Sequence, residues 1–155
     1  MANEPLLDRL QTLYSDHRIA LSAAEDPAGK LAEIYSDDVV FKDPVHTIRG
    51  RDKLAAFMHK VYEPVERCEF VFLDIWHAAA GNGLGHESAC IKWDMQLTHP
   101  RLNRGKQIVV RGMTEVHFSE QVYYHEDVYD MGAMIYQQVP VLGPTVNWIN
   151  ARLAR

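Results

Sequence analysis

The residues of this chain that could move a proton lie mainly in two segments. His125 and Asp127 are two positions apart in a stretch of β-branched and aromatic residues, and Asp43 directly precedes Pro44. Residues two apart on a strand share a face, so His125 and Asp127 can form an acid–base or orienting pair. The alternatives are a polar rim or a link to another strand for the pair, and the start of a turn for Asp43.

The segment 111–130 that holds this pair predicts two strands joined by a tight turn at Ser119-Glu120. That register places Thr114 opposite His125. One face then combines small residues with the acid–base pair: Gly112, Thr114, Val116, Phe118, Tyr123, His125, Asp127 and Tyr129. The other face is charged and mixed, which suits solvent or a partner subunit: Arg111, Met113, Glu115, His117, Val122, Tyr124, Glu126 and Val128. A slip of one residue would exchange the two faces.

The elements that must position this hairpin are helices before it and further strands around it. Helical spacing predicts one helix from Pro5 through His17 and Leu21, a short one after Asp26-Pro27 that carries Leu31, Ile34 and Tyr35, and one over 51–63. A short strand is predicted over 39–43, and longer ones near 66–78, 86–99, 107–118 and 121–130. Because the connections are short, we expect an antiparallel sheet, and the class is α+β with three N-terminal helices covering one face.

The end of the chain is predicted to be helical as well. One or two helical turns are expected over 131–138, followed by a terminal helix with Val146, Ile149 and Leu153 on one stripe. The run 139–155 is more apolar than a sheet edge needs, so we expect it to cover the open end of the fold or to contact a partner subunit. We expect one domain over 1–155, with a core of about 5–135 and a C-terminal extension over 131–155.

Composition excludes some classes of partner. The chain has 155 residues, 47% apolar and 24% charged, with a net charge of -5. No basic stripe is visible, which argues against nucleic acid. Cys68 and Cys90 lie in apolar runs typical of buried free thiols. No secretion signal or bilayer-spanning apolar run is evident, so we expect a cytoplasmic protein without a membrane partner.

Four short sequence motifs give the chain a family resemblance. They are YSDDVVFKDP from Tyr35, IRGRDKL from Ile48, VRGMT from Val110 and EDVYD from Glu126. In this order, over about residues 5–135, they resemble the SnoaL-like branch of the nuclear transport factor 2-like superfamily. The resemblance implies a cone-shaped roll with a pocket between the helices and the concave face of the sheet. That superfamily contains ketosteroid isomerases, polyketide cyclases, epoxide hydrolases, dehydratases and non-catalytic binding proteins, so the fold alone does not give the reaction.

The resemblance also suggests roles for individual residues. Asp43 matches the general base of ketosteroid isomerases, and Tyr14 is the nearest match to their oxyanion-hole tyrosine. Their second oxyanion donor falls on Thr114, whose hydroxyl makes a weaker hydrogen bond than a neutral carboxylic acid. In the cyclase branch the acid–base aspartate lies on a late strand, where Asp127 beside His125 is the counterpart.

Two further site types can be weighed from the same residues. The Asp-Arg-Asp trio of the epoxide hydrolases would require Arg111 to meet Asp127, but the predicted register puts them on opposite faces. A metal site is not favoured, because alternation separates His125 and Asp127 from His117 and Glu126, and no ligand spacing is present elsewhere. No cofactor-binding motif is recognised either.

Large aromatic residues could line an apolar ligand pocket, although many such residues simply fill a core. The candidate ligand-binding residues are Tyr35, Phe57, Tyr62, Trp93, Gly112 and Tyr129.

Two functions follow. The first is cofactor-free proton transfer on a small apolar substrate bearing a carbonyl or an epoxide, with Asp43 or Asp127 as the base, His125 orienting it, and Tyr14 or Thr114 donating to the oxyanion. The second is a non-catalytic protein that binds a small apolar metabolite or acts as a homodimer through the convex face of its sheet.

Overall fold

The computed structural model describes residues 4–15, 27–81, 83 and 85–153 of the chain. Within these residues, three helices precede the long strands: α1 (Glu4–Ser15), α3 (Pro27–Ala32) and α4 (Arg51–Tyr62). In α1, Leu6, Leu10, Leu13 and Tyr14 are buried, as their helical spacing predicts. The predicted continuation of α1 through His17 and Leu21 lies outside the described residues.

The second helix is shorter than predicted. It ends at Ala32, whereas Ile34 and Tyr35 were expected on its buried side. Tyr35 instead begins strand β1 (Tyr35–Lys42), where it pairs with Val122. The backbone N–H of Val122 also donates to the Ile34 carbonyl over 2.8 Å. Pairing with a distant strand has therefore overridden a local helical pattern.

The sheet has six strands in the order β2-β1-β6-β5-β4-β3. Besides β1, these are β2 (Thr47–Arg49), β3 (Arg67–Ala78), β4 (Glu87–Thr98), β5 (Ile108–Phe118) and β6 (Val122–Tyr129). The four long strands pair antiparallel, as their short connections predict. Strand β1 pairs parallel to β6, so the sheet is mixed. Short connections fix the direction only of the strands that they join, and β1 and β6 are far apart in sequence.

The predicted register of the β5–β6 hairpin was wrong by two residues. Thr114 pairs with Asp127, and His125 pairs with Val116. The loop between Phe118 and Val122 has one residue more than predicted, and the register shifts once more next to the loop. Ser-Glu is not a favoured two-residue turn, which accounts for the longer loop.

Because the register error is two residues, an even number, most side chains of the hairpin still point to the face that was predicted. His125 and Asp127 still point to the concave side with Thr114. The exceptions lie at the irregularity itself, where Val122 is fully buried and Tyr123 is exposed, the reverse of the prediction.

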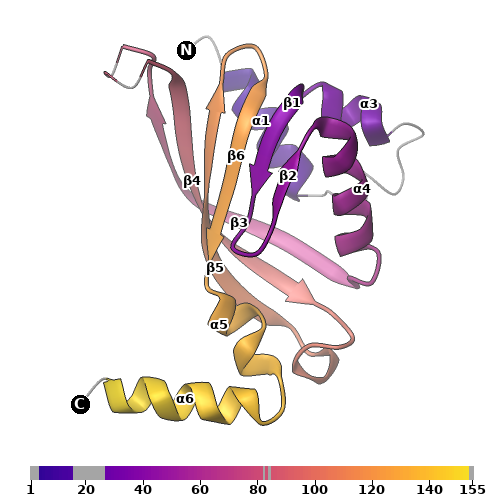
Figure 1. The fold of residues 1–155 in the computed structure, drawn as a ribbon, viewed down its shortest axis with the longest axis vertical. Helices are drawn as coiled ribbons and strands as arrows, with labels where there is room; N and C mark the ends of the chain where they lie inside the picture. Colours follow the sequence, from indigo (N-terminus) through magenta and orange to yellow (C-terminus); the bar gives the residue numbers. More distant parts are fainter. Residues whose placement is uncertain (1–3, 16–26, 82, 84, 154–155) are drawn as a thin grey trace.

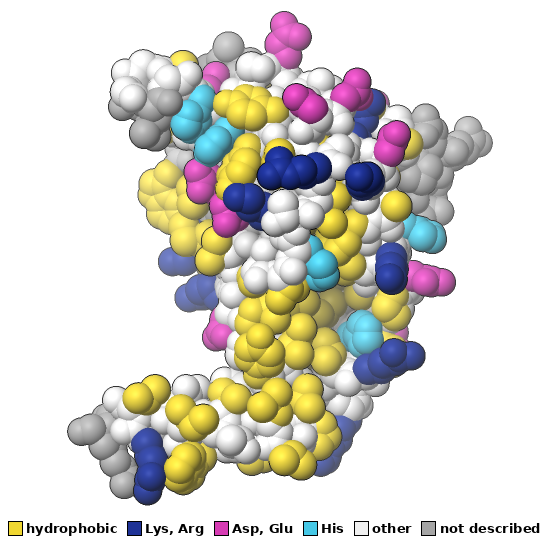
Figure 2. Space-filling view, viewed as in Figure 1, with side chains coloured by type: hydrophobic (Ala, Val, Ile, Leu, Met, Phe, Trp, Pro, Cys, Tyr) yellow, Lys and Arg dark blue, Asp and Glu magenta, His cyan; other side chains and the backbone are white. Residues whose placement is uncertain are grey.

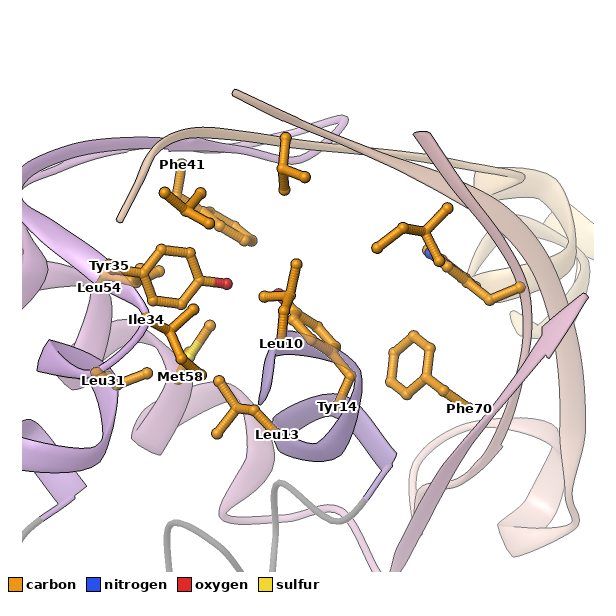
Figure 3. Close-up of a cluster of buried hydrophobic side chains, with 14 of the residues drawn as sticks. Leu10, Leu13, Tyr14, Leu31, Ile34, Tyr35, Phe41, Leu54, Met58 and Phe70 are labelled. Carbon is orange, nitrogen blue, oxygen red and sulfur yellow. The ribbon is translucent and has the colours of Figure 1, made fainter. Parts of the chain in front are cut away.

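The sheet is curved, and α1, α3 and α4 lie on its concave side (Figure 1). The core fills the space between them, with Leu10, Leu13 and Tyr14 projecting from α1 toward side chains of α3, α4 and the strands (Figure 3). The α+β class with helices packed on a curved sheet is thus confirmed. No helix in the described residues has the length and apolar character needed to cross a membrane.

The C-terminal segment consists of α5 (Met131–Met134), the 3-10 helix η2 (Tyr136–Gln138) and α6 (Leu142–Leu153). Asp130 caps α5 by accepting a hydrogen bond from the Ala133 N–H. The segment leaves the end of β6, and α6 runs away from α3 and α4 (Figure 1). Because α6 packs mainly on η2, it does not cover the open end of the cone. Of the two expectations for this run, the contact with a partner subunit stays a prediction.

Candidate functional site

His125 is the centre of a buried polar network on the concave side of β6. Its side chain is fully buried. The Nε2 atom lies 2.9 Å from Asp127 Oδ1 and 3.2 Å from the Tyr14 hydroxyl, and Nδ1 lies 3.0 Å from the Tyr35 hydroxyl. Strand β6, strand β1 and helix α1 thus each contribute to one cluster.

The partners of His125 fix which ring nitrogen carries the proton of the neutral imidazole. A carboxylate can only accept hydrogen bonds, so Nε2 is the N–H that donates to Asp127. Nδ1 then accepts the hydrogen bond of the Tyr35 hydroxyl. The Tyr14 hydroxyl lies beside a nitrogen that already bears a proton, so Tyr14 accepts there, and it also forms a hydrogen bond with Tyr35.

Thr114 also orients the Asp127 carboxylate. The Thr114 hydroxyl donates to Asp127 Oδ1 over 2.6 Å and accepts from the Trp93 indole N–H over 2.8 Å. This chain of donors runs across three neighbouring strands, from β4 through β5 to β6. Oδ1 therefore takes two hydrogen bonds, while Oδ2 has no hydrogen-bond partner in the described part of the chain.

The negative charge of Asp127 and burial together keep the surrounding tyrosines protonated. Burial is the main cause that raises the pKa of Tyr14, and the neighbouring Tyr35 and Asp127 add to it. Burial also raises the pKa of Tyr35, Tyr62 and Tyr129, with Asp127 contributing to each. At neutral pH these hydroxyls are therefore hydrogen-bond donors.

An apolar recess lies beside the network, between α1 and the strands. It is lined by Leu10, Gln11, Tyr14, Phe70, Phe72, Ile91, Trp93 and Thr114. Its volume is about 10 Å³, roughly the room of a single water molecule. The side chains of α1 occupy most of the hollow that the curved sheet forms (Figure 3). A ligand larger than a water molecule would therefore require the side chains that line the recess to move.

The candidate base Asp43 lies outside the network. Its Oδ1 accepts hydrogen bonds from the backbone N–H groups of Val45 over 2.8 Å and His46 over 2.7 Å, and the His46 ring lies 3.0 Å away. Both carboxylate oxygens contact that ring. These bonds match the alternative reading, in which Asp-Pro starts a turn. Asp43 still contributes to the raised pKa of Tyr129.

The remaining candidate residues lie around the network rather than inside the recess. Tyr35 faces His125 and begins β1, and Phe57 packs on Phe41 with ring centroids 5.8 Å apart. Tyr62 is partly buried against the core. Gly112 lies under the Trp93 ring, and Tyr129 flanks the same ring at 6.3 Å.

Arg111 points to the other face of β5, as predicted. It binds Asp94 through two hydrogen bonds of 2.8 and 2.9 Å, so the epoxide-hydrolase trio with Asp127 is not formed. Among the described residues, no three His, Cys, Asp or Glu side chains are grouped closely enough to hold a metal ion.

Several residues of the site did not stand out in the sequence. Leu10, Phe70 and Phe72 line the recess but are ordinary core residues by type. Their spacing carried a weak signal, because Leu10 lies one helical turn before Tyr14 and the two phenylalanines alternate on β3. The hydrogen bond from Tyr35 to His125 joins strands that no local pattern brings together.

Comparison with known proteins identifies the family of the chain and its fold. The sequence profile of the SnoaL-like domain matches residues 17–122, which is more than half of the chain. This chain belongs to the SnoaL-like domain family. None of the curated proteins matches it.

Solved structures similar to this SnoaL-like chain share its fold. An NTF2-like protein of unknown function from Burkholderia pseudomallei is 13% identical with a TM-score of 0.69, over 91% of this chain and 99% of that one. A protein described as a SnoaL-like polyketide cyclase from Shewanella putrefaciens is 14% identical with a TM-score of 0.66, over 86% and 93%.

A third similar structure was solved with a small molecule. It is a protein of ketosteroid isomerase-like fold from Catenulispora acidiphila in complex with trimethylamine, 11% identical with a TM-score of 0.66, over 87% of this chain and 92% of that one. At these identities the likeness shows the fold alone.

Proposed function

We propose that this SnoaL-like protein catalyses cofactor-free proton transfer on a small, neutral, apolar substrate that carries a carbonyl group. The observation that carries the proposal is the buried His125–Asp127 pair, connected to Tyr14, Tyr35 and Thr114 beside an apolar recess. A core has no need of so many linked polar groups, and such networks are typical of active sites.

Asp127 is the base in this proposal. Thr114 and His125 both donate to its Oδ1, which leaves Oδ2 to take a proton from the carbon next to the substrate carbonyl. His125 and Thr114 are positioning residues, since each acts through Asp127. The proton moves from substrate carbon to Oδ2, and the electron pair of the C–H bond becomes the enolate.

Tyr14 is the donor to the enolate oxygen. Its pKa is raised, it lines the recess, and the proton on His125 Nε2 keeps Tyr14 from donating to that nitrogen, so its proton would turn from the neighbouring Tyr35 to a bound substrate. Thr114, the other candidate, has only one proton and gives it to Asp127, so it cannot also donate to the oxyanion. Returning the proton to another carbon of the enolate would complete an isomerisation.

The charge of the site indicates the substrate class. Among the described residues that line the recess there is no lysine or arginine, and Asp127 is a nearby negative charge. An anionic substrate would meet repulsion there without compensation. A neutral ketone with an apolar ring system suits both the aromatic lining and the single strong donor.

Exchange of α-hydrogens for deuterium in 2-tetralone tests the proposal. The protein is incubated with this ketone in D₂O, and the loss of the α-proton signals is followed by NMR. We expect catalysed exchange, and we expect Asp127→Asn to slow it by about 10²- to 10⁴-fold. Asp43→Asn is the matched control, because Asp43 lies in its own turn, and its rate should stay close to that of the native protein.

Equal rates for the native chain and Asp127→Asn would refute the proposal, as would a loss confined to Asp43→Asn. The second candidate function, non-catalytic binding of an apolar metabolite, is favoured by the mainly apolar lining of the recess. It predicts that 2-tetralone changes the fluorescence of the protein through Trp93 in all three proteins without any deuterium exchange.

A further inference from the structure

Gln11 is a polar residue of α1 that no step of the proposed reaction uses. It lies four residues after Leu7 and three before Tyr14, so the three side chains project from similar directions on the helix. Leu7 and Tyr14 are each 8% exposed, and Gln11 is partly buried. A carboxamide therefore lies at the edge of the buried stripe of α1, where an apolar residue would pack as well.

The Gln11 side chain lines the apolar recess. Four of the lining side chains carry a polar group: Gln11, Tyr14, Trp93 and Thr114. Two of these groups are occupied, because Trp93 donates to Thr114 and Thr114 donates to Asp127. The Tyr14 hydroxyl belongs to the buried network. The Gln11 carboxamide, in contrast, forms no hydrogen bond with the described part of the chain.

An unpaired carboxamide at this place can bind a second polar group of a substrate. The side chain of a glutamine presents a carbonyl acceptor beside an NH₂ donor. A hydroxyl group both donates and accepts, so it is the closest match. Because the Gln11 side chain is partly buried, water competes less for the amide than at an open surface, and a ligand that supplies the missing hydrogen bonds gains affinity.

The charge around the recess restricts the polar group further. The wall that the structure describes contains no lysine or arginine, and Asp127 is a nearby negative charge. A carboxylate or phosphate on the substrate would be repelled by Asp127 and would have only a neutral amide as its partner. An ammonium group would pair with Asp127 and block the proposed base. A neutral hydroxyl avoids both effects.

The spacing of Gln11 and Tyr14 indicates where the hydroxyl lies on the substrate. Residues three apart on a helix have Cβ atoms about 5–6 Å apart. In the proposed reaction Tyr14 holds the enolate oxygen, so the hydroxyl belongs several bonds away from the carbonyl. The apolar lining includes Phe70 and Ile91, which suits a ring between the two oxygens.

We propose that Gln11 is a specificity-determining residue whose carboxamide binds a hydroxyl group of the substrate, so that the preferred substrate is a ring ketone that also carries one hydroxyl. The inference rests on the proposed proton transfer for the carbonyl end of the substrate, and on Gln11 alone for the hydroxyl end. A site that hydrogen-bonds a hydroxyl discriminates against the analogue without it, because the amide is then left unpaired.

Paired ketones test this role. 2-Tetralone is compared with hydroxy-2-tetralones that carry one hydroxyl on the aromatic ring, each at a different ring position. For every ketone, kcat/KM of deuterium exchange and the Kd are measured. We expect the native protein to favour at least one hydroxylated isomer over 2-tetralone by about threefold to tenfold in both quantities, which is the effect of one net hydrogen bond.

Gln11→Leu should abolish this preference, because leucine keeps most of the side-chain volume and lacks the amide. Its kcat/KM for 2-tetralone should stay close to the native value. Thr12→Val is the matched control on the same helix. The Thr12 hydroxyl donates to the Asp8 carbonyl over 2.8 Å and does not line the recess, so this variant should keep the native preference.

Binding elsewhere on the molecule is excluded by the comparison itself. Figure 2 shows hydrophobic side chains along α6, and Trp148 there is 57% exposed, so an apolar ketone can also adhere to that helix. The surface of α6 is the same in the native protein and in both variants. A change in the ratio between two ketones that appears only in Gln11→Leu therefore reports on the recess.

Two results would overturn the role of Gln11. The first is a native protein that prefers none of the hydroxylated isomers to 2-tetralone. The second is a preference that Gln11→Leu retains. The proton-transfer proposal fails separately: tighter binding of a hydroxylated ketone that depends on Gln11, without any deuterium exchange, would support Gln11 as a binding residue and contradict the catalysis.

Discussion

At the scale of single residues, the roles within the site depend on how many hydrogen-bond protons each side chain can donate. Thr114 has one hydroxyl proton, and neutral His125 has one N–H. Both are directed at the same oxygen of Asp127. In the proposed reaction the roles of donor and base are therefore separated by hydrogen-bond direction, and Tyr14, which lines the recess, is the proposed donor.

Tyr35→Phe tests the tautomer assignment. The substitution removes the hydrogen bond to His125 Nδ1 and leaves a buried acceptor unsatisfied, so we expect a loss of about 1–3 kcal/mol in the free energy of unfolding. Nitrogen NMR of the imidazole should show the Nε2–H form in the native protein and a mixture of forms in the variant. A native spectrum dominated by the Nδ1–H form would contradict the assignment.

At the scale of elements, the site depends on close contact between β4 and β5. Gly112 pairs with Trp93, and the indole ring lies directly over the glycine. A Cβ atom at position 112 would be 2.6 Å from Trp93 Cζ2 and closer still to Cη2. The glycine therefore allows the indole to reach Thr114 with its N–H.

Gly112→Ala should destabilise the protein by about 1–3 kcal/mol, since the large ring cannot move without losing its place in the core. The measurement is unfolding in urea, followed by tryptophan fluorescence. Gly81→Ala is the control, because nothing lies within 4 Å of a Cβ atom there and its backbone φ angle is not positive. Equal stabilities for the two variants would show that the Trp93 ring is free to shift.

The sequence predicted the strands themselves better than the way in which they connect and pair. Period-two alternation located β3 to β6 to within one or two residues, because alternation reports directly which face is buried. It could not give the register of the hairpin, which depends on the length of the loop and on the irregularity next to it. Nor could it give the pairing of β1 with β6. His125 and Asp127 were predicted as a pair because one strand carries both. The hydrogen bond from Tyr35 to His125 could not be predicted, because it depends on the pairing of β1 with β6.

At the scale of the whole molecule, the buried tyrosines link the site to global stability. The pKa of Tyr14 and that of Tyr35 are raised above the ordinary value of 10.0, mainly by burial. Above that pH the unfolded chain loses these protons while the native protein keeps them. Stability is therefore fully present below about pH 10 and declines as pH rises further, by up to about 1.4 kcal/mol per pH unit for each such tyrosine.

Urea unfolding across the alkaline range measures this decline. We expect Tyr35→Phe, although less stable at neutral pH, to lose stability with a shallower slope above pH 10, because one fewer tyrosine titrates on unfolding. A slope equal to that of the native protein would mean that Tyr35 ionises in the folded state as readily as in the unfolded one.

The parallel pairing of β1 with β6 has a consequence during synthesis. Until Val122–Tyr129 leaves the ribosome, the three-residue strand β2 is the neighbour that the described strands offer to β1. The site around His125 is therefore completed last, when β6 inserts between β1 and β5. A nascent chain that stalls before this point has the aromatic walls of the cavity but neither its carboxylate nor its imidazole.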